Sequence, residues 1–219
     1  MYRVAAFAEE RIEVMHALIH AHRLATVVIC VDGVPQADHL PLLLDPLPAP
    51  YGTLRGHVAR ANPLWRRLAD GLQALAIFQG PQSYVTPAWY PSKRETGQVV
   101  PTWNYAVVHA YGVPVVRDDR AWLRGLVSQL TEVQESSREQ PWSVDDAPAD
   151  YVERMLDAIV GIEMPITHLQ GKWKMSQNRT QTDRAGVAAG LTQAGDAQSA
   201  AVAALVRGNL AFDDGTAML

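Results

Sequence analysis

The chain has 219 residues, of which 48% are hydrophobic and 19% are charged. This composition is typical of a globular protein that buries a sizeable core as one large domain, or as a domain with an appendage. The sequence contains no run of about 18 apolar residues, and its first residues lack the pattern of a signal peptide, so a cytoplasmic location is expected. The net charge of −4 and a pI near 5.9 disfavour intrinsic nucleic-acid binding, although a local basic face stays open.

The first segments predict a helix followed by a hairpin. Phe7–His22 has apolar residues at helical spacing and acidic residues toward its start, where the helix dipole favours them. Leu24–Val31 is a continuous apolar run, and Asp32-Gly33 then leads into Val34–Leu44, which is a strong hairpin pattern. Cys30, the sole cysteine, lies in the first of these runs, so it is expected to be a small buried hydrophobe and not a nucleophile.

The middle of the chain alternates strands with a capped helix and a long loop. Asn62-Pro63 is expected to begin a short helix that ends at Ala69. Pro87–Thr102 holds several prolines with two tryptophans nearby, and its aromatic content favours an ordered, functional loop over disorder. Strands are expected at Gly52–Val58, Ala74–Gln79 with a continuation at Ser83–Thr86, Asn104–Val116 and Ile162–Leu169.

Helices are expected over Asp118–Glu139 and Asp150–Val160, and again from Asn178 onward, with a frayed tail from Gly208. The fold class is therefore α+β: about six strands in one antiparallel sheet, with helices at both ends and one helical insertion over 118–160. This pattern suggests a small antiparallel barrel wrapped by helices.

The three lysines fall in two short stretches, at Lys93 and at Lys172 and Lys174, whereas the sixteen arginines are spread along the chain. An ammonium is a compact point charge that suits a phosphate or a tuned base. The two stretches are therefore candidate site segments, with chance clustering as the alternative.

The segment Arg55–Pro63 places Gly56 inside a strand and then a helix start flanked by arginine. A strand glycine marks close approach of a ligand or of another backbone, and a helix N-terminus beside arginine suits an anion. Phosphate binding and a β-bulge that feeds a surface helix with solvated arginines are equally consistent with this pattern.

Ser83–Lys93 and Pro101–Tyr105 combine hydroxyls, aromatic rings and one ammonium, as a planar heteroaromatic ligand with a phosphate would require. Asn104 offers a donor and an acceptor to a ring edge. The alternative is a structural loop held by buried Trp and Tyr side chains.

In Gly171–Asn178, the residues Lys172, Lys174 and Ser176 occupy alternate positions, so an extended segment would project them from one face toward an anion or an electron-rich ring. A solvated lysine pair is the alternative. His16 and His20 lack a further ligand at usable spacing, so no metal site is expected.

Five motifs in order resemble the PaiB family of FMN-binding negative transcriptional regulators, over about Met1 to Leu191. They are Asp38–Pro41, Gly56–Pro63, Ser83–Tyr90, Val100–Tyr105 and Gly171–Asn178. Thr86 and Ala88 stand where the family commonly has Ser. The resemblance implies a split-barrel domain over 1–191. The residues 192–219 lie outside the match and are expected from their sequence to form a helical extension or tail. The resemblance also implies a homodimer with FMN at the subunit interface.

The resemblance, combined with residue chemistry, assigns roles to a cofactor-binding set. Arg55, Arg60 and Lys93 are expected to meet the phosphate, and Gly56, His57 and Val58 to line the ring by backbone approach. Trp103 and Asn104 would cover or read the ring edge, while Lys174, Ser176 and Gln177 would close the site from the same or the partner subunit. Asn62 completes the twelve cofactor-binding residues.

Three functions are consistent with these expectations: a flavin-binding regulator that acts through another protein, an FMN-dependent oxidoreductase, and a haem-binding split-barrel protein. No catalytic base beside a nucleophile can be identified, as expected where a flavin supplies the chemistry. No element that reads a DNA groove can be identified either, so direct DNA binding is the least expected activity, and any partner protein is unknown.

Overall fold

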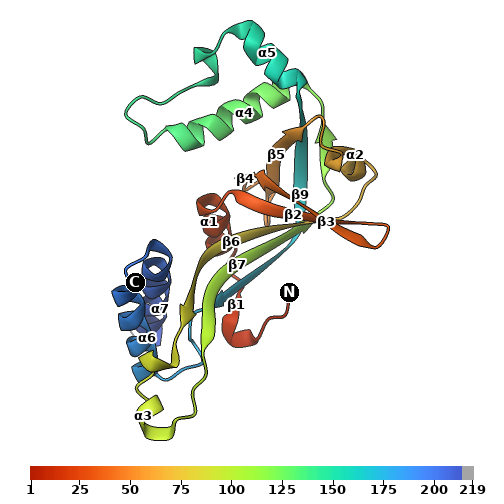
Figure 1. Ribbon diagram of the computed structural model, residues 1–219. Helices are drawn as coiled ribbons and strands as arrows, with labels where there is room; N and C mark the ends of the chain where they lie inside the picture. The colour runs from red at the N-terminus through yellow and green to blue at the C-terminus, as the bar shows by residue number, and fades with distance from the viewer. Residues whose placement is uncertain (214–219) are drawn as a thin grey trace. The chain divides into compact units, whose positions relative to one another are not determined.

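The computed structural model describes residues 1–213, which divide into two compact units (Figure 1). Unit 1 comprises Met1–Arg11, Gln79–Val108 and the chain from Gln170 onward, and unit 2 comprises Ile12–Phe78 and His109–Leu169. The division falls within three long strands. The domain bounds expected from the sequence, 1–191 and 192–219, stay a prediction.

The described residues form a nine-stranded sheet of order β3-β2-β6-β7-β9-β5-β4, and β1 and β8 also pair with β9. Six strands have seven or more residues, and β1, β4 and β8 have two or three. The strands are β1 Ala8–Glu9, β2 Leu24–Val31, β3 Val34–Pro41, β4 Leu43–Asp45, β5 Thr53–Ala59, β6 Ala74–Val85, β7 Thr102–Gly112, β8 Val115–Arg117 and β9 Ile159–Lys174.

In unit 2, β2 and β3 form the predicted antiparallel hairpin, with Val31 opposite Val34. Asp32 and Gly33 have positive φ angles of 51° and 79°, as a two-residue hairpin turn that follows the strand twist requires. Cys30 is exposed, so the expectation that it is buried is wrong. Alternate residues of β2 are buried, and Cys30 lies on the face that is not.

Strand β5 of unit 2 pairs antiparallel with β4 and β9. A Cβ added at Gly56 would lie 2.5 Å from Leu42 Cδ2 and 2.9 Å from the Pro41 carbonyl oxygen. Gly56 thus allows the neighbouring backbone to approach closely. The sequence alone left open whether a ligand or another backbone approaches this glycine.

Helix α1 (Ile12–Ala21) in unit 2 begins five residues later than predicted. The residues before it form a short 3-10 helix, η1 (Ala5–Phe7), and strand β1, which pairs with β9. The Glu9 carboxylate accepts the Arg11 backbone N–H at 2.9 Å and its Nη2–H at 2.6 Å. These bonds hold the segment extended, and the helix starts only after them.

The predicted insertion in unit 2 forms two helices that pack on a small core of their own. Helix α4 begins after Asp119, whose carboxylate accepts the Trp122 backbone N–H at 2.7 Å. Leu123 of α4 packs with Val144, Val152 and Leu156. The helices of unit 2 after α1 are α2 (Leu64–Ala69), α4 (Arg120–Glu135), η3 (Val144–Asp146) and α5 (Ala149–Asp157).

Unit 1 contains η1, η2 (Pro87–Trp89), α3 (Lys93–Thr96), α6 (Gln181–Ala194) and α7 (Ala197–Asp213), and the last two helices lie side by side (Figure 1). The frayed tail expected from Gly208 is wrong as far as Asp213, because α7 continues to that residue. The rest of the expected tail, 214–219, lies outside the described residues. Within 1–213, no helix is long and apolar enough to cross a membrane.

Candidate functional site

The twelve predicted cofactor-binding residues fall six in each unit, and we describe each group separately. In unit 2 they lie on β5 and the turn after it: Arg55, Gly56, His57, Val58, Arg60 and Asn62. In unit 1 they lie at the start of α3, on β7, and at the end of β9 with the turn after it: Lys93, Trp103, Asn104, Lys174, Ser176 and Gln177.

Arg55 is held by two carboxylates of unit 2. Its Nη1 lies 3.0 Å from Asp45 Oδ2, and its Nε–H donates to Glu163 Oε2 at 2.9 Å. Arg117 donates to the other oxygen of Glu163 at 2.6 Å. Burial alone would raise the pKa of Glu163, but the hydrogen bonds from Arg117 and Arg55 outweigh burial and lower it. The guanidinium of Arg55 is therefore already neutralised.

Arg60 is likewise engaged, by Asp118. Its two terminal nitrogens donate to the Asp118 carboxylate at 2.9 and 2.6 Å, a bidentate geometry that favours the ionised pair. These bonds raise the pKa of Arg60. Its Nε–H also donates to the Asp157 carbonyl at 2.7 Å. Both predicted phosphate arginines are thus paired, and their role toward phosphate stays a prediction.

The other predicted residues of unit 2 differ in how far their polar groups are used. Asn62 donates to Asp38 at 2.9 Å and accepts the backbone N–H of Leu64, the first residue of α2, at 2.8 Å. Val58 is buried in the core. The Nδ1 atom of His57 is buried and has no hydrogen-bond partner among the described residues, and burial lowers the pKa of this imidazole.

Unit 1 brings three cations close together. Lys174 Nζ donates to the Trp103 carbonyl at 2.8 Å and to the Thr102 hydroxyl. Lys172 Nζ donates to the Tyr2 carbonyl at 3.1 Å and lies 5.4 Å from the centre of the Tyr105 ring. The third is Arg179, and we call Lys172, Lys174 and Arg179 the cationic cluster.

No member of the cationic cluster forms an ion pair with any residue of 1–213. Arg179 lies over the Tyr90 ring, with its Cζ 4.8 Å from the ring centre. Burial, then Lys172, then Arg179 lower the pKa of Lys174. An ammonium carries three donors, and Lys174 uses two of them inside the protein, so one remains for a ligand.

A buried hydrogen bond fixes the turn after β9. Asn104 Nδ2–H donates to Ser176 Oγ at 2.9 Å, and their exposed fractions are 0% and 3%. Ser176 has a φ of 64°, so the extended segment ends at Lys174. The prediction that Ser176 continues the face of the two lysines is therefore wrong. Gln177 closes the turn, since its side chain accepts the Met175 N–H at 2.6 Å and donates to the Trp173 carbonyl at 2.5 Å.

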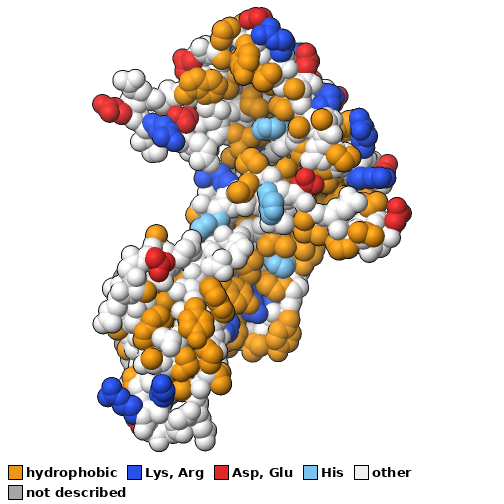
Figure 2. All heavy atoms as spheres, in the orientation of Figure 1, with side chains coloured by type: hydrophobic (Ala, Val, Ile, Leu, Met, Phe, Trp, Pro, Cys, Tyr) orange, Lys and Arg blue, Asp and Glu red, His pale blue; other side chains and the backbone are white. Residues whose placement is uncertain are grey.

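Two exposed aromatic side chains belong to the same unit. Trp103 is 52% exposed and Tyr84 is 46% exposed, and their ring centres lie 6.1 Å apart at an interplanar angle of 71°. Hydrophobic side chains also reach the surface on the face drawn in Figure 2. Lys93 is also exposed, at the start of α3.

The sequence interpretation named Lys172 as a candidate but left it out of the cofactor-binding set, and it missed Arg179. The position of Lys172, two residues before Lys174 in an extended segment, was a reason to include it in the cofactor-binding set. No sequence pattern marks Arg179, because its relation to Tyr90 arises only when the turn after β9 brings distant segments together.

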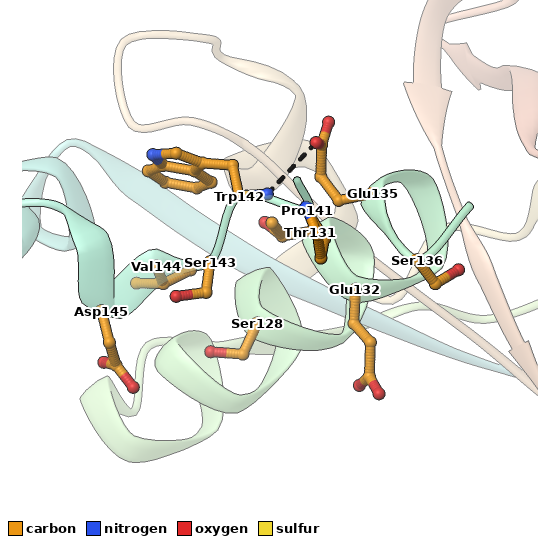
Figure 3. A pocket seen from close by; sticks show the side chains of 10 residues that line it. All are labelled: Ser128, Thr131, Glu132, Glu135, Ser136, Pro141, Trp142, Ser143, Val144 and Asp145. Atoms are coloured by element: carbon orange, nitrogen blue, oxygen red, sulfur yellow. Dashed lines mark hydrogen bonds between the residues drawn. The ribbon is translucent and has the colours of Figure 1, made fainter. Parts of the chain in front are cut away.

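A cavity of about 430 Å³ lies in unit 2 between the end of α4 and the loop that leads to η3, and it contains none of the twelve residues. Figure 3 shows its lining, in which the Glu135 carboxylate accepts the Trp142 backbone N–H at 3.3 Å. Within 1–213, no group of three or more His, Cys, Asp or Glu side chains could hold a metal ion.

Two solved structures have a fold similar to that of this chain. A FAD- and haem-binding protein from Mycobacterium smegmatis has a TM-score of 0.56 at 19% identity, and the match covers 81% of this chain and 78% of that protein. The flavocytochrome Anf3 from Azotobacter vinelandii has a TM-score of 0.57 at 16% identity, with 82% and 72% covered. At these identities the likeness concerns the fold alone.

The sequence comparisons identify the family. The family described as "Putative FMN-binding domain" matches residues 1–168. The protease synthase and sporulation protein PAI 2 of Bacillus subtilis is 34% identical, over 84% of this chain and 85% of that protein. An uncharacterized protein of Emericella nidulans is 36% identical, over 94% and 96% of the two chains. The chain belongs to this FMN-binding family, and the resemblance to PaiB proteins is confirmed.

Proposed function

We propose that this protein binds FMN and that the cationic cluster of unit 1 meets the negative charge of the flavin. The observation that carries this proposal is the group of three cations without an ion-pair partner in 1–213, in the unit that also exposes Trp103 and Tyr84. Uncompensated positive charge favours an anionic ligand, and exposed aromatic faces favour a planar one.

The chemistry of these residues fits FMN, which combines a flat heteroaromatic ring with a phosphate. When bound, the flavin would supply hydride or electron transfer. Lys174 has a donor to spare, and an anion beside it would restore the ammonium that burial and its cationic neighbours disfavour. The Asn104–Ser176 hydrogen bond would hold the turn that carries Gln177 in place.

The roles expected for the other residues remain part of the proposal. Arg55 and Arg60 can reach a phosphate only by leaving their carboxylates, so we expect them to contribute less than Lys174. His57 would contact the ligand through its unpartnered Nδ1. Gly56 and Val58 would line the ring, Asn62 would hold the turn before α2 through its bond from the Leu64 N–H, and exposed Lys93 would meet the phosphate.

Titration of the apoprotein with FMN, riboflavin and FAD tests this proposal. Lys174→Ala should weaken FMN about tenfold or more, because a charge-assisted hydrogen bond contributes about 1.5–3 kcal/mol, and riboflavin should change less. Arg154→Ala, a surface variant on α5 whose partner is Asp150, is the control. Equal affinity of the native protein for FMN and riboflavin would contradict the proposal, and so would tight haem binding in place of flavin, seen as a Soret band.

We further propose that the protein is a cytoplasmic homodimer that regulates transcription indirectly, through a partner protein. The relative PAI 2 is described as a protease synthase and sporulation protein, and a net charge of −4 gives no general affinity for DNA phosphates. A mobility-shift assay with duplex DNA at physiological salt should show no specific complex. A tight, sequence-specific shift by the flavin-loaded protein alone would contradict the indirect mechanism.

A further inference from the structure

A second cavity of unit 2, of about 310 Å³, lies between helix α4 and the segments around α1 and β4. Its α4 wall consists of Gln129, Glu132 and Val133, which share one face of the helix. Arg23 and Leu43 are among the residues on the other side. The volume is at the lower end of the range of about 300–1,000 Å³ that small-molecule sites occupy.

Four charged side chains line this cavity: two of them form ion pairs within the chain, and two do not. Arg55 pairs with Asp45 at 3.0 Å and also with Glu163. Arg23 and Glu132 form no ion pair with any described residue, and Arg23 Nε is buried without a hydrogen-bond partner. Because buried polar groups are nearly always hydrogen-bonded, the buried Nε–H of Arg23 is a donor that a ligand of this cavity could use.

His20 is the remaining titratable group of the lining. Burial, then Arg23, then His16 lower the pKa of His20 below its ordinary value of 6.5, so at neutral pH it adds no charge. The lining therefore presents one unmatched positive charge and one unmatched negative charge, which come from different elements on different walls.

We propose that this cavity binds a small zwitterion with an apolar body, an aliphatic α-amino acid, whose carboxylate pairs with Arg23 and whose ammonium pairs with Glu132. A simple anion would be repelled by Glu132 and a simple cation by Arg23, whereas a zwitterion satisfies both. Leu43, Pro46 and Val133 give its side chain apolar surface. Arg23 and Glu132 are not among the proposed flavin contacts, whereas Arg55, which also lines the cavity, is one of them. The test of the zwitterion site therefore uses Arg23 and Glu132.

Calorimetric titration of the FMN-loaded protein with L-leucine tests the proposal, with isocaproate and isoamylamine as analogues that lack the ammonium and the carboxylate. Leucine should bind, and each analogue should bind about tenfold more weakly or worse. Arg23→Gln should weaken leucine by a similar factor. Glu132→Gln should also weaken leucine but strengthen isocaproate, because it removes the repulsion. Arg124→Gln, on α4 and outside the lining, should change nothing.

Retention of FMN and of the unfolding midpoint will show that the variants fold. If Arg23→Gln does not fold, Arg23→Lys keeps the charge without the planar fork, and it should bind leucine with intermediate affinity. Absence of leucine binding by the native protein would overturn the proposal. Unchanged leucine affinity in Glu132→Gln would also overturn it, because the protein would then recognise only the carboxylate of leucine and not its ammonium.

Discussion

Ser176 occupies the left-handed backbone region, at φ 64°, although it carries a side chain. Non-glycine residues in this region cost about 1 kcal/mol or more, and they persist only where the surroundings determine them. Here the determining contact is the buried bond that the Asn104 amide donates to the Ser176 hydroxyl. Ser176 directly precedes Gln177 and follows Lys174 by two residues, and both of these are proposed flavin contacts.

This geometry predicts an unusual order of stability among variants of Ser176. Ser176→Ala leaves the buried Asn104 amide without a partner and should lower the free energy of unfolding by about 1–3 kcal/mol. Ser176→Gly loses the same bond but relieves the backbone strain, so it should be less destabilising than Ala. Urea unfolding measures both variants, and an Ala variant as stable as the Gly variant would contradict the prediction.

Glu163 predicts a pH dependence. Its pKa in the folded protein lies below the ordinary value of 4.5, because the hydrogen bonds from Arg117 and Arg55 outweigh burial. The stability that this carboxylate contributes is therefore fully present above about pH 4.5, and it is lost as pH falls through the folded-state pKa. As the pH falls below about 5, the Glu163→Gln variant should therefore lose less unfolding free energy than the native protein loses.

Asp150 supplies the matched control for this experiment. It pairs with Arg154 at 2.7 Å, four residues away on α5, and its side chain is 74% exposed. Exposed pairs of this kind contribute little, so Asp150→Asn should leave the acid limb of the stability profile nearly unchanged. An equal effect of the two substitutions would show that Glu163 has no special part in acid unfolding.

At the scale of elements, the loop over 87–102 shows what a sequence can and cannot predict. The prediction of an ordered loop with tryptophans agrees with η2 and α3, but the reason for its order lies 91 residues away. Ser92 Oγ–H donates to Asp183 Oδ2 of α6 at 2.7 Å. Trp89 packs against α6 at Gly186 and Gly190. A contact between segments this far apart produces no recognisable residue pattern in the sequence of either segment.

Local patterns predicted the elements whose causes are local. The hairpin at Asp32-Gly33, the start of α2 after Asn62-Pro63 and the strand β2 each depend on neighbouring residues, and each is found close to its predicted place. The late start of α1 depends on pairing of β1 with β9, and the pairing of Arg60 with Asp118 joins residues 58 positions apart. Those features require the folded chain.

The packing of Trp89 on α6 predicts opposite effects for two helical glycines. A Cβ at Gly190 would lie 2.3 Å from the Trp89 ring, so Gly190→Ala should cost about 1–3 kcal/mol of unfolding free energy. A Cβ at Gly125 of α4 would meet nothing within 4 Å, so Gly125→Ala should add about 0.5–1 kcal/mol through helix propensity. Thermal or urea unfolding compares them, and equal stabilisation would refute the packing argument.

At the scale of the whole molecule, unit 1 leaves Trp103 and Tyr84 about half exposed and Val100 63% exposed. Exposed apolar and aromatic patches mark interaction surfaces, and a two-fold interface would cover such a patch on both subunits at once. The expected homodimer would have flavin sites composed of residues from both subunits. Light scattering at micromolar concentration should therefore give twice the chain mass of 24.0 kDa.

A composite site also predicts complementation between two defective variants. Lys174→Ala removes a cation of unit 1, and His57→Asn removes an imidazole of unit 2 whose Nδ1 is unpartnered. If one subunit supplies Lys174 and the other supplies His57, a mixed dimer contains one site with both substitutions and one intact site. Isolated mixed dimers should then bind about half as much FMN as the native dimer, measured by flavin fluorescence, whereas each variant alone should show no recovery. A monomeric mass, or no recovery in verified mixed dimers, would show that each flavin site is built within one chain.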